Sequence, residues 1–265
     1  MTLGRIAGTT AAALALLGSF LASPTPSDAA TSLPAAGSAR VTAAPAARTS
    51  AVLGVEVFGH SLKGRALRAY HLGDPTSPNK VVFIASIHGD EPGPQRLLVN
   101  LMHGAPITGA DIWVIPRFNA DGLARNTRTD ARGVDLNRNY PINWIRQRGK
   151  YNSGRRPASE PETRAMMRFL SSIKPNFIVS MHQPLKGVDT SYGKARSLAL
   201  RLVDGLHLPA KVFNCNSGCH GTLTEWYNHK FPGAALTVEY GYKISHYQAR
   251  VSGPDGLLAA VFASR

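Results

Sequence analysis

The sequence predicts an α/β fold in which a mixed, mostly parallel sheet is flanked by helices. Strand-like and helix-like segments alternate along the chain, which is the order of elements in α/β proteins. The strand-like segments are continuous apolar runs, such as residues 81–87, and such runs indicate strands covered on both faces. Polar residues directly follow several of these runs, as expected for ligand sites in open α/β sheets.

The first 50 residues are predicted to lie outside this fold. Arg5 precedes an uncharged, Ala- and Leu-rich stretch, and Ser27-Asp28-Ala29 offers a small-x-small cleavage site. We therefore expect residues 1–29 to be a signal peptide, with a retained membrane anchor as the alternative. Residues 30–50 are rich in Ala, Pro, Ser and Thr and predict a flexible linker, which leaves 51–265 for the catalytic domain.

Six aliphatic or aromatic runs predict strands. The first two strands are joined around Gly64 and form a hairpin. The other four lie farther along the chain and are separated by helix-like segments. The predicted strands are 52–58, 66–71, 81–87, 111–116, 177–181 and 236–238.

Four segments are predicted to be helices. Pro94 suits the first turn of one helix, and Ser159 before Pro161 indicates the start of the next. Residues 119–138 are polar and rich in arginine, and they are expected to be irregular. The predicted helices are 94–102, 160–173, 195–206 and 256–263.

The chain is strongly basic, with a formal net charge of +14. Removal of residues 1–29 takes away one basic and one acidic side chain, so the mature chain keeps this charge. Such a charge favours anionic polymers, and for an exported protein we expect an anionic cell wall or membrane surface. The alternative is a basic surface that only aids solubility. No dense Lys/Arg run with interleaved aromatics occurs, so nucleic-acid binding is not indicated.

The two cysteines, Cys215 and Cys219, stand on either side of a Ser-Gly pair. In an exported chain, such a close pair favours a disulfide over a metal clip. Two unpaired thiols are the alternative.

Three of the apolar runs lead into residues that can bind a metal or accept a proton. His88-Gly89-Asp90-Glu91 follows residues 81–87, His182 follows 177–181, and Glu239 follows 236–238. Two histidines and a glutamate can hold a hydrolytic zinc ion with one open position. Taken singly, each residue also fits a buried histidine or a surface carboxylate.

Together with residues 133–141, these segments resemble the M14 metallocarboxypeptidases, the family of carboxypeptidase A, over residues 54–241. Within that family they are most similar to the bacterial murein peptide amidase branch. The resemblance implies a zinc carboxypeptidase-like α/β sandwich and cleavage between γ-D-glutamate and diaminopimelate in peptidoglycan peptides. The stretches that carry it are 88–91, 119–122, 133–141 and 237–241.

The resemblance also implies roles at the metal centre. His88, Glu91 and His182 would hold one Zn²⁺ per chain. Asp135 matches the aspartate that orients a ligating histidine, which here would be His88. Glu239 would take a proton from the attacking water and pass it to the leaving amine. A capping or turn role is the alternative for Asp135.

Further residues match substrate-binding positions. Arg128 matches the arginine that stabilises the oxyanion, with Arg125 and Arg132 as competitors in the same loop. Asn137 and Arg138 match the pair that binds the terminal carboxylate of the substrate. A solvated loop or a surface salt bridge is the alternative for the arginines.

The sequence departs from the digestive members in two respects. Gln183-Pro184 replaces their Ser-Tyr pair, and their substrate-capping tyrosine has no clear counterpart. The specificity pocket is expected within 221–229, where Glu225 is a candidate partner for a basic or zwitterionic side chain, and solvent exposure is its alternative. The candidate tyrosines are Tyr192, Tyr227, Tyr240 and Tyr242.

The function predicted from the sequence is an exported zinc peptidase that acts on cell-wall peptides next to a free carboxyl terminus. A secreted carboxypeptidase for ordinary L-peptides would need the same residues. A non-catalytic wall-binding module on the same scaffold and a deacylase of small N-acyl amino acids are two further hypotheses.

Overall fold

The computed structural model describes residues 50–213 and 219–265. The predicted signal peptide, residues 1–29, and nearly all of the predicted linker lie outside the described residues. Cys215 also lies outside them, so the disulfide between Cys215 and Cys219 stays a prediction. Among the described helices, none combines the length and the apolar character needed to cross a membrane.

One eight-stranded sheet runs through the described residues in the order β1-β2-β4-β3-β5-β8-β6-β7. The four central strands, β4, β3, β5 and β8, are parallel to one another, whereas β1 and β2 form an antiparallel hairpin at one edge. β6 pairs antiparallel with β8. The strands are β1 (Val52–His60), β2 (Ala66–Gly73), β3 (Lys80–Ala85), β4 (Asp111–Ile115), β5 (Phe177–His182), β6 (Gly187–Asp189), β7 (Ala210–Lys211) and β8 (Ala234–Glu239).

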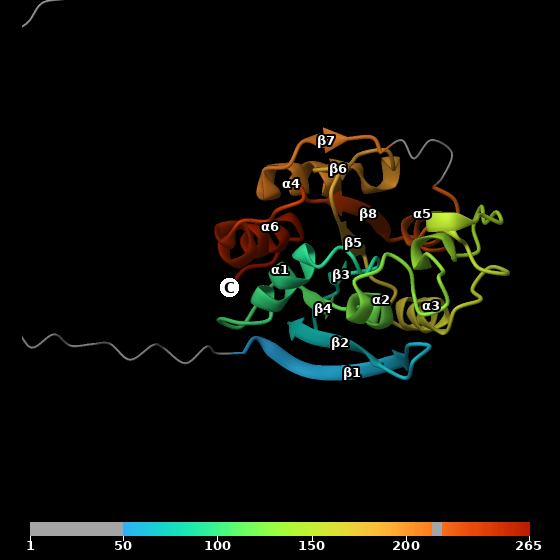
Figure 1. Ribbon diagram of the computed structural model, residues 1–265. Helices are drawn as coiled ribbons and strands as arrows, with labels where there is room; N and C mark the ends of the chain where they lie inside the picture. The colour runs from blue at the N-terminus through green and yellow to red at the C-terminus, as the bar shows by residue number, and fades with distance from the viewer. Residues whose placement is uncertain (1–49, 214–218) are drawn as a thin grey trace, which may run out of the picture. The chain divides into compact units, whose positions relative to one another are not determined.

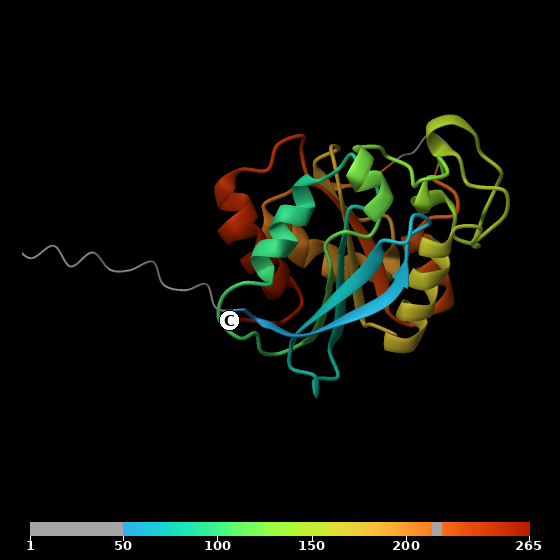
Figure 2. The same cartoon turned by 60° about the horizontal axis from the view of Figure 1, so that its bottom comes forward.

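Helices cover both faces of the sheet (Figures 1 and 2). One face packs against α1, α4 and α6, and the other packs against α3 and α5, so each face has its own apolar core. A short α2 follows β4. The α-helices are α1 (Gly93–Leu101), α2 (Ala120–Arg125), α3 (Pro161–Ile173), α4 (Arg196–Leu206), α5 (Leu223–Lys230) and α6 (Gly253–Ala260). Single helical turns of other types occur at Leu136–Arg138, Gly149–Tyr151, Gly193–Ala195 and Gln248–Ser252.

The predicted fold class is confirmed, and each of the six strands and four helices predicted from the sequence is present with shifted ends. β3 ends at Ala85, earlier than predicted, because Ser86 adopts a left-handed φ of 57° and turns the chain before His88. The sequence did not indicate β6, β7, α2 or α5. β6 and β7 are only three and two residues long, too short for a periodic pattern.

Candidate active site

The predicted metal-binding and catalytic residues lie at the carboxyl ends of three neighbouring parallel strands, at one edge of the sheet. β3, β5 and β8 lie side by side, with β5 in the middle. His182 and Glu239 are the last residues of β5 and β8 and are register partners, and His88 follows the end of β3. The three segments, far apart in sequence, therefore meet at one point.

His88, Glu91 and His182 converge through the atoms that ligate metals. The Nδ1 atoms of the two histidines lie 3.2 Å apart. His88 Nδ1 is 2.8 Å from Glu91 Oε1, and His182 Nδ1 is 2.9 Å from Glu91 Oε2. A tetrahedral ion with bonds of 2.0–2.1 Å separates its ligand atoms by about 3.3 Å. All three side chains are buried, so this donor set fits a single divalent cation.

In each histidine, Nε2, the ring nitrogen that points away from the cluster, has its own hydrogen-bonding partner. His88 Nε2 lies 3.2 Å from Asp135 Oδ1, and His182 Nε2 lies 2.9 Å from Ser180 Oγ. Such partners fix the ring orientation so that Nδ1 of each histidine faces the other two side chains of the cluster. The structure thus places Asp135 beside His88, as the resemblance implied. Ser180 was missed, although a lone serine two residues before His182 in an apolar strand was an available signal.

The electrostatics of this cluster favour a bound cation. Burial lowers the pKa of His88, but the charges of Asp135 and Glu91 outweigh it and raise this pKa to about 9. Burial raises the pKa of Glu91, but the two histidines bring it well below its usual range. The carboxylate therefore stays ionised and the site attracts positive charge, which a divalent ion supplies in place of protons.

Gly89 allows the loop that carries His88 and Glu91 to pack closely. A Cβ atom at this position would lie 2.1 Å from the carbonyl carbon of Gly122, at the start of α2. A side chain at residue 89 would displace one of these two backbones. The glycine in His88-Gly89-Asp90-Glu91 is therefore required by a close approach of two backbone segments.

Glu239 lies beside the cluster without joining it. Its side chain is buried and its Oε2 accepts a hydrogen bond of 3.1 Å from the Leu185 amide. Burial raises the pKa of Glu239 above its usual value. A carboxylate with a raised pKa is a stronger proton acceptor, as a general base requires.

A cavity of about 470 Å³ opens over the cluster and Glu239. The predicted substrate residues Arg128, Asn137 and Arg138 line it. Arg138 is largely buried, and its Nη1 donates to the Asn137 carbonyl at 2.8 Å. Its Nε is buried and has no hydrogen-bond acceptor within the described part of the chain.

The three candidate loop arginines have different surroundings. Arg128 Nε donates to Asp135 Oδ2 at 2.9 Å, and its Nη1 lies 3.6 Å from Glu91 Oε1. Arg125 instead donates to the Asp130 carbonyl. Arg132 pairs with Glu160 at 2.9 Å. Of the three, only Arg128 lines the cavity.

Tyr151 was missed by the sequence reasoning. It lines the cavity, and the guanidinium carbons of Arg128 and Arg138 lie 5.4 and 5.1 Å from its ring centre. Such cation–π contacts hold both arginines in place. Tyr151 belongs to a single helical turn in a polar loop, so no periodic pattern pointed to it.

The four candidate tyrosines differ in position. Tyr192 lines the cavity, whereas Tyr227 and Tyr240 are buried in the apolar cores. Tyr242 is exposed and lines a neighbouring cavity that also contacts Glu91.

Glu225 does not line the cavity over the metal cluster. It is half-buried on α5, and its Oε1 accepts a hydrogen bond from the Asn143 side chain. Neither the predicted contact with a substrate side chain nor the alternative of full exposure matches this position. Besides Glu91 and Glu239, the acidic residue that lines the cavity is Asp189 at the end of β6.

A second group of buried carboxylates, Asp130, Glu160 and Glu162, brings oxygens within 4.8 Å of one another outside this cavity. Asp130 Oδ1 accepts from the amides of Arg132 and Val134, while Oδ2 has no partner within the described residues. Burial raises the pKa of Asp130 to about 7, the Val134 amide opposes the rise, and the charge of Glu160 adds to it.

Asp130→Asn is expected to stabilise the protein at pH 8 by on the order of 2 kcal/mol. In the unfolded chain, Asp130 loses its proton above the ordinary pKa of 3.8, whereas in the folded protein it keeps the proton up to about pH 7. The free energy of unfolding therefore falls as the pH rises from 3.8 to about 7. Asparagine keeps the Oδ1 acceptor and carries no charge. Urea unfolding at pH 8 and pH 5 checks this, and a gain that is no larger at pH 8 would contradict it.

Comparison with known proteins agrees with this geometry. A family model described as zinc carboxypeptidase, Peptidase_M14, matches residues 40–243. Murein peptide amidase A of Escherichia coli K12 is 31% identical over 150 residues, which cover 51% of this chain and 62% of that protein. Its counterpart in Vibrio campbellii is 30% identical over 146 residues, covering 50% of this chain and 58% of that protein. The chain thus spans less than two thirds of these relatives.

Solved structures show the same fold. The murein-tripeptide amidase MpaA from Escherichia coli O157 has a TM-score of 0.63 at 25% identity, over 79% of this chain and 91% of that one. Carboxypeptidase A from Helicoverpa armigera has a TM-score of 0.65 at 16% identity, over 80% and 68% of the two chains, which is a likeness of fold alone. Because the family model spans most of the sequence, including every residue of the metal cluster, the chain belongs to the zinc carboxypeptidase family, Peptidase_M14.

Proposed function

We propose that this protein is an exported zinc-dependent hydrolase that cleaves a peptide bond next to a free carboxyl terminus in cell-wall peptides. The bond between γ-D-glutamate and diaminopimelate is the proposed target. One observation carries the proposal: His88, Glu91 and His182 converge in the same cavity as Glu239 and Arg138. The relatives named murein peptide amidase support the choice of substrate.

In the proposed mechanism, one Zn²⁺ held by His88, Glu91 and His182 would polarise the substrate carbonyl and make water more acidic. Glu239 takes a proton from the attacking water and delivers it to the leaving amine. The Leu185 amide holds Oε2 of Glu239, which leaves Oε1 to carry the proton.

The loop residues position the substrate. The Arg138 guanidinium lines the cavity and receives the terminal carboxylate as a charged fork. Asn137 Oδ1 accepts from the Leu223 amide at 3.0 Å, so its amide nitrogen faces the substrate as a donor. Arg128 stabilises the negative charge that develops on the carbonyl oxygen.

Arg138→Gln is expected to lower kcat/KM on substrates with a free carboxyl terminus by about 100-fold, since a charged hydrogen bond is lost. On the same peptide with an amidated terminus, the substitution should change kcat/KM by less than about threefold, because there the guanidinium has no carboxylate to bind. Steady-state kinetics on the acid and amide pair check this. An equal loss of kcat/KM on both substrates would show that Arg138 does not bind the terminal carboxylate.

Asp189→Asn is expected to raise KM about tenfold on peptides that end in diaminopimelate. The buried carboxylate of Asp189 lines the cavity and can pair with the second amino group of that residue. Peptides that end in alanine lack this group and should be unaffected, and a KM comparison on the two peptides checks this. Equal KM changes for both would remove Asp189 from side-chain recognition.

The function is tested on the full-length purified protein with the tripeptide L-Ala-γ-D-Glu-diaminopimelate and a panel of L-peptides. Release of diaminopimelate, read by mass spectrometry and absent with Glu239→Gln, is the expected result. Faster turnover of plain L-peptides would instead identify a general carboxypeptidase. If zinc is bound and no peptide is cleaved, the hydrolase proposal fails.

A further inference from the structure

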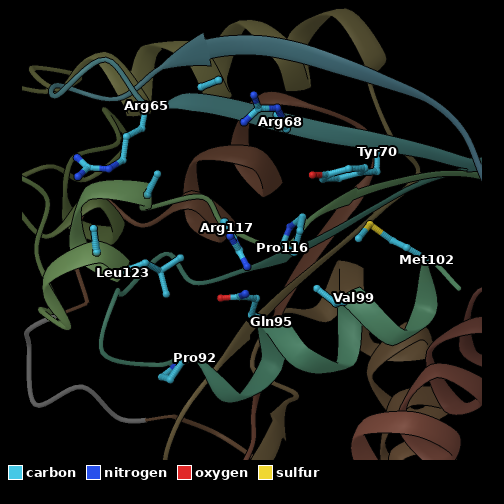
Figure 3. A pocket seen from close by; sticks show the side chains of 13 residues that line it. Arg65, Arg68, Tyr70, Pro92, Gln95, Val99, Met102, Pro116, Arg117 and Leu123 are labelled. Carbon is cyan, nitrogen blue, oxygen red and sulfur yellow. The ribbon is translucent and has the colours of Figure 1, made fainter.

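A second cavity, of about 830 Å³, lies outside the active site, between β2 and α1 (Figure 3). Arg68 and Tyr70 extend into it from β2, and Gln95 and Arg117 face each other across from them. The alternation of side chains along a strand explains this position. Leu67 and Ala69 are buried against the α3 side, so the residues next to them must point to the opposite face.

This cavity carries uncompensated positive charge. None of the residues that line it is acidic. Arg65 at its end is neutralised by Asp121, at 2.5 Å. Arg117 contacts the uncharged Gln95, whose amide oxygen can accept from Nε and Nη2 at 2.8 and 3.1 Å. Within the described residues, Arg68 and Arg117 form no ion pair.

The positive charge continues beyond this cavity toward the active site. An adjoining cavity of about 310 Å³ shares Gln95 and Arg117 with the first, and it adds Arg96 and Arg250. No acidic residue lines it either. Arg96 also lines the cavity of about 890 Å³ that contacts Glu91 and Arg128. A basic strip therefore leads from β2 to Arg96, at the edge of this third cavity, whose lining also includes Asp90 and Lys243.

We infer that this strip, the arginine groove formed by Arg68, Arg96, Arg117 and Arg250, binds a phosphodiester polymer of the cell envelope. Guanidinium groups pair with phosphate oxygens through two parallel hydrogen bonds. Four guanidinium groups spread over adjoining cavities suit a chain of repeated negative charges better than one small anion.

The floor of the groove suits the rest of such a polymer. Val99, Met102 and Leu123 line the first cavity and offer apolar contacts to the carbon atoms between phosphates. The inference rests on the proposed function, because a polymer of the wall holds the enzyme where its peptide substrate is found. The groove then retains the protein on the wall while the neighbouring cavity receives the peptide.

The test measures wall binding with catalysis removed. The full-length Glu239→Gln protein is sedimented with purified cell walls that retain their phosphodiester polymers, and with the same walls after hydrofluoric acid has removed these polymers. Four groove arginines are then changed together: Arg68→Gln, Arg96→Gln, Arg117→Gln and Arg250→Gln. A matched control removes the same charge from positions outside the groove: Arg155→Gln, Arg168→Gln, Arg196→Gln and Lys230→Gln.

The groove variant should bind intact walls about tenfold more weakly at an ionic strength of about 0.15 M, and the control should change less than about threefold. The parent protein, which carries Glu239→Gln alone, should bind acid-stripped walls weakly. Its binding there should be as weak as that of the groove variant to intact walls. Equal losses of wall binding in the groove variant and the control would show that only net charge matters, which would overturn the inference. Equal binding of the parent protein to intact and stripped walls would overturn it too.

A second measurement needs no substitution. Soluble inorganic polyphosphate should release the parent protein from intact walls at a lower phosphate concentration than orthophosphate does. Equal potency of the two would contradict binding of a repeated charge. Hydrolysis of the soluble tripeptide is measured separately on the active enzyme, so failure of the groove and failure of the proposed function give different results.

Discussion

Replacing Glu239 with glutamine is expected to lower kcat by about 10²- to 10⁴-fold while the metal content stays unchanged. Glutamine keeps the shape of the side chain and can still accept from the Leu185 amide, but it cannot take a proton from water. Glu239 is not one of the three clustered ligand residues, so metal binding does not depend on it. Steady-state kinetics and metal analysis of the same preparation give both quantities.

Thr237 supplies a control for this substitution. It lines the same cavity from β8, two residues before Glu239, and it cannot act as a base near neutral pH. Thr237→Val should therefore change kcat by less than about tenfold. Retention of most activity by Glu239→Gln would show that another group accepts the proton.

Replacing His182 with alanine is expected to weaken zinc binding by more than about 10³-fold and to abolish hydrolysis. The substitution removes one of the three proposed ligand side chains and leaves His88 and Glu91 as the other two. Titration against a chelator of known affinity measures the loss, and unfolding curves show whether the variant is folded.

Ser180→Ala gives a graded comparison for the same ligand. It removes the hydroxyl 2.9 Å from His182 Nε2 and leaves every ligand atom in place. Loss of such an outer partner costs about 10- to 100-fold in metal affinity. If His182→Ala bound zinc no more weakly than Ser180→Ala, His182 would not be a ligand.

The central sheet and the convergence of the candidate metal ligands were predictable from the sequence because both depend on local patterns. Residues 81–87 and 177–181 are apolar runs of the kind found in strands covered on both faces. The chemical residues follow those runs directly, and parallel strands place their carboxyl ends at one edge. His88, His182 and Glu239 therefore met where the sequence indicated.

The choice among the loop arginines was not predictable from the sequence. Arg125, Arg128 and Arg132 lie within eight residues of each other and have the same chemistry. What separates them is their partners. Arg128 meets Asp135, whereas Arg132 meets Glu160, which comes much later in the chain. Such contacts form only when the loop folds against the sheet.

Residues from short elements were missed for a related reason. Asp189 lies on a three-residue strand and Tyr151 on a single helical turn, so neither belongs to a repeating pattern. The arginine groove combines side chains from β2, from α1, from the residues after β4 and from the turn before α6. No single stretch of sequence shows that those positions adjoin.

Anomalous X-ray diffraction at the zinc absorption edge, from crystals grown with zinc, tests the central claim most directly. We expect one strong peak at about 2.0–2.2 Å from Nδ1 of His88, from Nδ1 of His182 and from the Glu91 carboxylate. No peak between these three side chains, or a peak only at Asp130, Glu160 and Glu162, would contradict the assignment of the metal site and of the hydrolase built on it.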